Sequence, residues 1–210
     1  MYRHRGASLK RSVYGLLVCL PLLCSAQLGI NVTDASGQPV ADAVIYAEAL
    51  SGKPPKGKLV ATIDQIDKEF VPLVTVVQTG TAIRFPNKDN IRHNIYSFSP
   101  AKVFDLKLYS GTPAAPIVFD KAGQVVLGCN IHDWMVAYLL VVDTPWFDKS
   151  DAKGLASLVG LPTGDYLLRV WHPYQSTEAP AQKIKVGSGA ESRFVFRLKL
   201  APPTTGTHAK

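Results

Sequence analysis

The most constraining feature of this chain is the segment 129–135, in which Cys129, His132 and Met135 recur at every third position. These side chains carry a thiol, an imidazole and a thioether. A Cys at the end of a strand, followed by a short loop, can direct all three groups toward one point. A fourth group must then come from a neighbouring strand, and His93 precedes a predicted strand that can supply it. The pattern therefore favours a β-sheet in which two distant segments are adjacent.

The chemistry of these four groups points to copper. Thiolate and thioether ligands suit Cu(I), whereas imidazoles also accept Cu(II), and a His₂Cys set with a weak axial Met holds electron-transfer copper sites. We therefore expect one copper ion per chain, bound by His93, Cys129, His132 and Met135. A buried structural cysteine is the alternative explanation of Cys129, and a core methionine is that of Met135.

The N-terminus reads as an export signal. Four basic residues precede an apolar run from Val13 to Leu23, which is too short to span a bilayer, and small residues follow at Ser25 and Ala26. We expect cleavage near Ala26 and a periplasmic chain with no integral membrane segment; lipidation at Cys24 is the alternative. Cleavage would leave Cys129 as the single thiol, with no partner for an internal disulfide.

The charge balance argues against nucleic acid as a partner. Removal of the signal takes away four basic residues and no acidic one, so the formal net charge falls from +7 to +3. No dense Lys/Arg patch with interleaved aromatic residues remains.

The remaining sequence predicts an all-β chain. Short alternating segments are separated by Gly, Pro, Asn and Asp, and no stretch has a helical period. The predicted strands are 28–33, 43–47, 73–77, 81–85, 94–98, 117–119, 124–127, 135–142, 155–159, 166–171, 182–186 and 194–200. Many short strands with regular turns are typical of β-sandwiches.

Four central segments carry a family resemblance: Val77–Thr81, Phe85–Asp89, His93–Ser99 and Gly128–Met135. Together they resemble a cupredoxin, the Greek-key copper sandwich, and the gaps around His132 resemble the ligand loop of amicyanin. The chain as a whole resembles plastocyanin-like proteins labelled methylamine utilization proteins. The resemblance implies that His93, Cys129 and His132 are equatorial ligands and Met135 the axial one. It also implies that the Asn94 side chain bonds across to the Cys-bearing strand. Asp133–Trp134 stands where amicyanin-type loops often have Pro.

A second resemblance concerns the two ends of the chain. Val32–Tyr46 and Gly160–Tyr166 are similar to two parts of a carboxypeptidase regulatory-like (transthyretin-like) β-sandwich, here about a hundred residues apart. We therefore expect the cupredoxin to be nested in, or packed beside, this second sandwich. The expected divisions are a signal peptide at 1–26, the outer sandwich at 27–60 plus 145–200, the cupredoxin at 61–144 and a flexible tail at 201–210.

The function expected from these observations is transfer of single electrons between a redox donor and an acceptor that dock transiently. Copper storage, delivery or sensing is the alternative, although only two Met occur in the chain. A copper enzyme is not expected, because only His172 and His208 remain as spare histidines after the ligands and the signal are set aside. His172 is expected to pack within the outer sandwich or to face solvent, and the charges at Lys88–Asp89 and 102–107 to be solvated.

Overall fold

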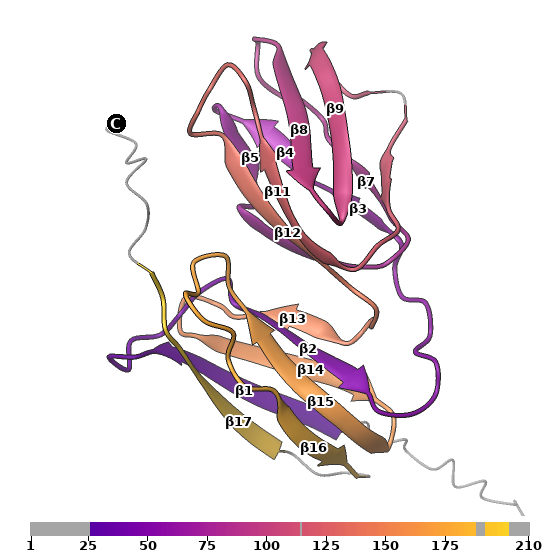
Figure 1. The fold of residues 1–210 in the computed structure, drawn as a ribbon, viewed down its shortest axis with the longest axis vertical. Coiled ribbons are helices and arrows are strands. Elements are labelled where there is room, and N and C mark those ends of the chain that lie inside the picture. The colour runs from indigo at the N-terminus through magenta and orange to yellow at the C-terminus, as the bar shows by residue number, and fades with distance from the viewer. Residues whose placement is uncertain (1–25, 114, 188–191, 202–210) are drawn as a thin grey trace, which may run out of the picture.

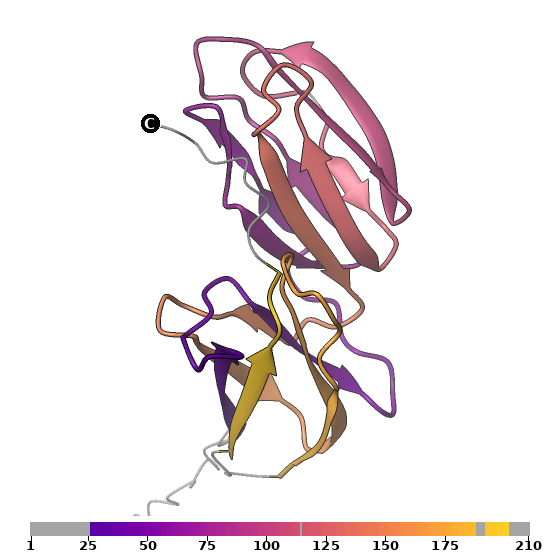
Figure 2. The same cartoon turned by 60° about the vertical axis from the view of Figure 1, so that its left-hand side comes forward.

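The computed structural model describes residues 26–113, 115–187 and 192–201, and within these every regular element is a β-strand (Figure 1). The strands form two sandwiches stacked end to end (Figure 2). The prediction of an all-β chain is confirmed. The predicted signal peptide lies outside the described residues apart from Ala26, and the predicted tail lies outside them apart from Ala201.

The lower sandwich is built from both ends of the described chain. One sheet has the order β14-β1-β17 and the other has the order β13-β2-β15-β16. Their bounds are β1 (Ala26–Asp34), β2 (Val44–Ala49), β13 (Phe147–Lys149), β14 (Leu155–Leu161), β15 (Gly164–Trp171), β16 (Gln182–Val186) and β17 (Ser192–Leu198). The central strand β1 runs antiparallel to β14 and parallel to β17, and its buried residues Leu28, Ile30 and Val32 alternate along one face, as a strand's period of two requires.

The upper sandwich is built from the middle of the chain. A five-stranded sheet, β6-β12-β11-β8-β9, faces a three-stranded sheet, β10-β7-β3, and a hairpin of β4 and β5 lies beside them. The bounds are β3 (Val60–Thr62), β4 (Asp64–Ile66), β5 (Glu69–Val71), β6 (Val74–Gln78), β7 (Thr81–Arg84), β8 (His93–Ser99), β9 (Lys102–Tyr109), β10 (Ile117–Phe119), β11 (Gly123–Gly128) and β12 (Val136–Val142). The core includes Phe85, Phe119, Leu127 and Leu139, all fully buried.

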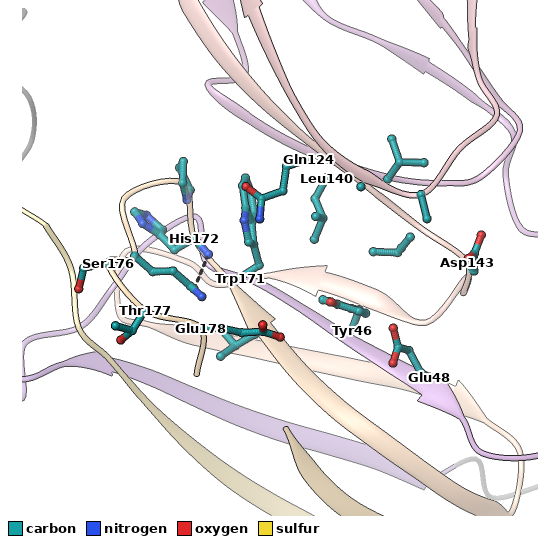
Figure 3. A pocket seen from close by; sticks show the side chains of 17 residues that line it. Tyr46, Glu48, Gln124, Leu140, Asp143, Trp171, His172, Ser176, Thr177 and Glu178 are labelled. Atoms are coloured by element: carbon teal, nitrogen blue, oxygen red, sulfur yellow. Dashed lines mark hydrogen bonds between the residues drawn. The ribbon is translucent and has the colours of Figure 1, made fainter. Parts of the chain in front are cut away.

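A third, smaller core joins the two sandwiches. Val44 and Trp171 from the lower one pack with buried apolar residues of the upper one, which are Val74, Leu140 and Val142. Lys149 reinforces the junction, since its Nζ donates to the carbonyl of Val74 at 2.7 Å and to Asp42 at 2.6 Å. Beside this core lies a cleft of about 530 Å³, whose wall carries Trp171 and His172 on one side and Gln124 and Leu140 on the other (Figure 3).

All twelve predicted strands are present, with their ends shifted by a few residues. Five strands were not predicted: β3, β4, β5, β9 and β13. Four of these have only three residues, too few to show a period. The fifth, β9, is an edge strand: its charged residues Asp105 and Lys107 are exposed, as expected, while Phe104 and Leu106 alternate with them and pack against the core. No helix in the described residues has the length and apolar character of a membrane span.

Candidate metal centre

The four predicted ligands come from three places at one end of the five-stranded sheet. His93 is the first residue of β8, Cys129 directly follows β11, and Met135 directly precedes β12, with His132 in the loop between. Gly128 pairs with Tyr96 of β8 and with Val136 of β12, so the register brings these strand ends together. The opposite end of β12 lines the cleft between the sandwiches, and seven residues of strand separate the two ends by roughly 20 Å.

The structure brings three of the predicted ligands into one cluster. One ligand atom from each of His93, Cys129 and His132 lies within 4.8 Å of the others. The Sγ of Cys129 is 3.9 Å from the Nδ1 of His93, and the two imidazole rings are 4.9 Å apart between centroids. His93 and Cys129 are buried, whereas His132 is partly exposed. A thiol and two imidazoles thus meet at one site, of which His132 is the partly exposed member.

The Nδ1 atom of His132 shows that this cluster fits a metal ion. It is buried and has no hydrogen-bond partner among the described residues, and a buried polar atom without a partner costs free energy. Burial is the main cause that lowers the pKa of His132, and the positive charge of Lys68 lowers it further against the opposing charge of Asp89. The ring therefore stays neutral, and available as a ligand, to a lower pH than an ordinary histidine. The soft sulfur and two nitrogens are the donors expected of a copper site.

Met135 ends the loop that carries Cys129 and His132. It is buried in the core cluster that also contains Cys129, and its backbone N–H donates to the carbonyl of His132 at 2.9 Å, which closes the loop. The loop between Cys129 and Met135 is thus a tight turn.

Asp89 fixes the ring of His93. The Nε2 of His93 lies 2.7 Å from the Oδ2 of Asp89. Burial by itself raises the pKa of Asp89, but hydrogen bonds from the Lys68 amide, from His93 and from the Asp67 amide outweigh it, so the net pKa is lowered. An ionised carboxylate only accepts, so Nε2 donates to Asp89, and Nδ1 is the nitrogen that faces Cys129. Such contacts orient ligand imidazoles.

Asn94 ties the two ligand-bearing segments together, as predicted. It is buried, and its Oδ1 accepts a hydrogen bond from the backbone N–H of Asn130, the residue after Cys129, at 2.8 Å. This bond holds the loop against β8 and fixes the distance between Cys129 and His93.

Replacing Asn94 should therefore weaken both the fold and the site. We expect Asn94→Ala to lower the free energy of unfolding by about 1–3 kcal/mol, because the Asn130 N–H loses its acceptor. Copper affinity should fall about 10–100-fold. Denaturant unfolding and competition titration measure the two effects. Asn130→Ala is the matched control, since it keeps the backbone N–H and removes only an exposed side chain; equal effects of both variants would contradict this role.

The partly exposed edge of the site presents two large apolar side chains beside the exposed Asp133. The Trp134 ring lies 5.1 Å from the ring of His132, and both Trp134 and Ile131 are about half exposed. His172 belongs to the lower sandwich, where it is buried against Tyr174, and it is not part of the cluster.

Two contributors were missed by the sequence interpretation. Asp89 was taken as an ordinary solvated charge, although its position four residues before His93 is a usable signal. Tyr109 lies opposite His93 in the register of β8 and β9; its hydroxyl donates to the carbonyl of Phe85 at 2.7 Å and accepts from Gln65. Burial, and secondarily the charge of Cys129, raise the pKa of Tyr109 to about 12 despite the Gln65 hydrogen bond. No local pattern links Tyr109 to His93; the pairing of β8 with β9 brings them together.

Comparisons with known proteins were made for the whole chain. No protein-family model and no curated protein matches it. Among solved structures, a purple cupredoxin from Nitrosopumilus maritimus matches at 25% identity over 39% of this chain and 98% of its own, with a TM-score of 0.35. A Cu(I) structure of an amicyanin mutant matches at 16% identity over 46% of this chain and 98% of its own, with a TM-score of 0.35.

A third match covers more of this chain but only part of the matching protein. The Cu-containing nitrite reductase from Thermus scotoductus SA-01 matches at 23% identity and a TM-score of 0.37, over 53% of this chain and only 28% of its own.

Proposed function

We propose that the upper sandwich holds one copper ion through His93, Cys129, His132 and Met135, and that the protein carries single electrons between redox partners. The observation that supports this most strongly is the cluster itself: a thiol and two imidazoles within 4.8 Å, with the buried Nδ1 of His132 unpartnered in the described chain.

The donor set suits a carrier rather than an enzyme. Bound copper would supply one-electron chemistry by alternating between Cu(I) and Cu(II), both of which this mixture of sulfur and nitrogen ligands accepts. The protein's own residues supply the rest. Cys129, His93 and Met135 are held by core packing, Asp89 and Asn94 orient their neighbours, and burial excludes water. A site held in this way rearranges little when its charge changes.

The apolar edge formed by Ile131, His132 and Trp134 is the proposed contact surface for partners. Electron-transfer encounters use small, short-lived interfaces, and an apolar rim around the most exposed ligand lets a partner approach the metal closely. This proposal includes location in the periplasm, supported by the N-terminal pattern of basic, apolar and small residues.

We further propose that residues 61–144 are a unit inserted between 27–60 and 145–200. Three observations support this division. Strands before residue 60 and after residue 143 share sheets with each other, the two sandwiches have separate cores, and the chain crosses between them near Ser51–Lys58 and near Thr144.

The test of the proposed function is a redox cycle followed by visible absorption. The mature protein with one equivalent of Cu(II) should show an intense blue band that disappears when a reductant is added and returns with an oxidant, through several cycles without loss. A potentiometric titration of this band should follow a single one-electron Nernst curve. A protein that binds copper without colour, or that loses the metal on reduction, would contradict the carrier function and favour copper storage or delivery.

A further inference from the structure

The turn that joins β4 to β5 adopts an unusual backbone conformation. Asp67 and Lys68 have φ values of 54° and 61°, in the left-handed region that favours glycine or asparagine. Two-residue hairpins with positive φ at both positions prefer Asn-Gly. Neither glycine nor asparagine occupies this turn, so its shape is maintained by contacts elsewhere.

Those contacts run to the carboxylate of Asp89. The backbone N–H of Asp67 donates to Oδ1 at 2.7 Å, and that of Lys68 donates to Oδ2 at 2.9 Å. The same Oδ2 accepts from Nε2 of His93 at 2.7 Å. Both oxygens of one carboxylate are therefore engaged, and the turn and the imidazole meet at the same atom. Hydrogen bonds to an ionised acceptor are shorter and stronger than neutral ones.

The stem of the hairpin is anchored to the segment that leads into Asp89. The backbone N–H of Gln65 donates to the carbonyl of Pro86, and the N–H of Lys88 donates back to the carbonyl of Gln65, both at 2.9 Å. The side chain of Lys88 reaches Asp64 at 2.7 Å. The Asp89 backbone N–H donates in turn to Oδ1 of Asn87 at 3.0 Å. Hairpin and carboxylate thus share one rigid frame.

A second contact links the hairpin to the opposite side of the ligand. The Nε2 of Gln65, a fully buried residue of β4, donates to the hydroxyl of Tyr109, and Tyr109 lies opposite His93 in the pairing of β8 and β9. The hairpin therefore reaches both Asp89 and the strand that pairs with His93.

We infer that the β4–β5 hairpin is a positioning element of the metal centre: the backbone amides of Asp67 and Lys68 hold the Asp89 carboxylate where it orients His93. This role rests on the proposed function, in which His93 is a metal ligand. The hydrogen bonds themselves can be tested in the metal-free protein. Asp89 and the two turn residues are positioning residues, because none of them is a proposed ligand. The turn contributes to this hydrogen-bonded chain through its backbone amides and not through its side chains.

The test inserts one glycine between Asp67 and Lys68, which moves the two amides out of register with Asp89. In the metal-free protein, exchange of the His93 Nε2–H with solvent, followed by ring ¹⁵N–¹H correlation, should become at least about tenfold faster. Affinity for Cu(II) should fall about 10–100-fold. The pair Asp67→Asn/Lys68→Gly keeps both amides and suits the backbone, so it should leave the exchange of this proton unchanged.

Two further variants of the protein complete the test. One glycine inserted after Thr163, in the turn between β14 and β15, is the control and should change neither quantity. Asp89→Asn guards against misfolding of the insertion variant: one carbonyl oxygen cannot serve three donors, so exchange should again accelerate. Unchanged exchange in both the insertion variant and Asp89→Asn would overturn the inference. Faster exchange in a chain whose wild type binds no copper would uphold the positioning role and refute only the metal assignment.

Discussion

Replacing Cys129 with serine should abolish the visible colour of the copper-loaded protein. An intense band requires a thiolate bonded to the metal, and the described chain has one cysteine, whose Sγ lies 3.9 Å from Nδ1 of His93. Serine preserves the size of the side chain but offers a neutral hydroxyl oxygen in place of the soft thiolate, and hard oxygen is a poor ligand for Cu(I). We expect affinity for Cu(I) to fall by more than the 10–100-fold that outer contacts cost.

Visible absorption and competition titration measure these losses. Met135→Leu is the matched control, because it keeps the volume of a buried side chain. It removes only the weak axial donor, so the band should persist, with an altered position or intensity. A Cys129→Ser protein that keeps the band, or that binds Cu(I) as tightly as the wild type, would exclude the thiolate as a ligand.

Replacing Trp171 with alanine should separate the unfolding of the two sandwiches. Trp171 is 7% exposed and packs in the core that joins them. Removing a buried aromatic side chain of this size costs about 3–5 kcal/mol. We expect the wild type to unfold in one transition and Trp171→Ala to unfold in two, with the lower sandwich first. The copper band should report the second transition unchanged, since the site lies roughly 20 Å away along β12.

Denaturant unfolding followed by near-ultraviolet circular dichroism and by the copper band distinguishes the two transitions. Val159→Ala provides the control, because Val159 is 63% exposed and its replacement should change stability by no more than about 0.5 kcal/mol. A single unfolding transition in Trp171→Ala, with a loss below about 1 kcal/mol, would show that the junction contributes little.

The proposed ligands could be identified from the sequence because three of them are encoded locally. Cys129, His132 and Met135 lie within one loop, so their spacing alone carries the signal. The prediction of His93 required only one assumption, which is that its strand lies next to the Cys-bearing strand. The pairing of β8 with β11 agrees with this assumption. The contact of Asn94 with the Cys-bearing segment was implied by the resemblance to cupredoxins, and the hydrogen bond from the Asn130 N–H agrees with it.

The contacts between the β4–β5 turn and Asp89 could not be predicted from local sequence patterns. The turn at Asp67–Lys68 follows a three-residue strand with no visible period and lacks the residues that mark such turns. Its meeting with Asp89 depends on the packing of segments about twenty residues apart. Likewise, Trp171 looks like any buried aromatic in a strand, and nothing local indicates that it packs against a second sandwich.

X-ray absorption at the copper edge tests the central claim most directly. The spectrum of protein loaded with one equivalent of copper should show one sulfur at short distance and two imidazole nitrogens, in both oxidation states and with little change between them. A first shell of oxygen and nitrogen alone, or a ligand set that changes completely on reduction, would contradict an electron-carrying centre built from His93, Cys129 and His132.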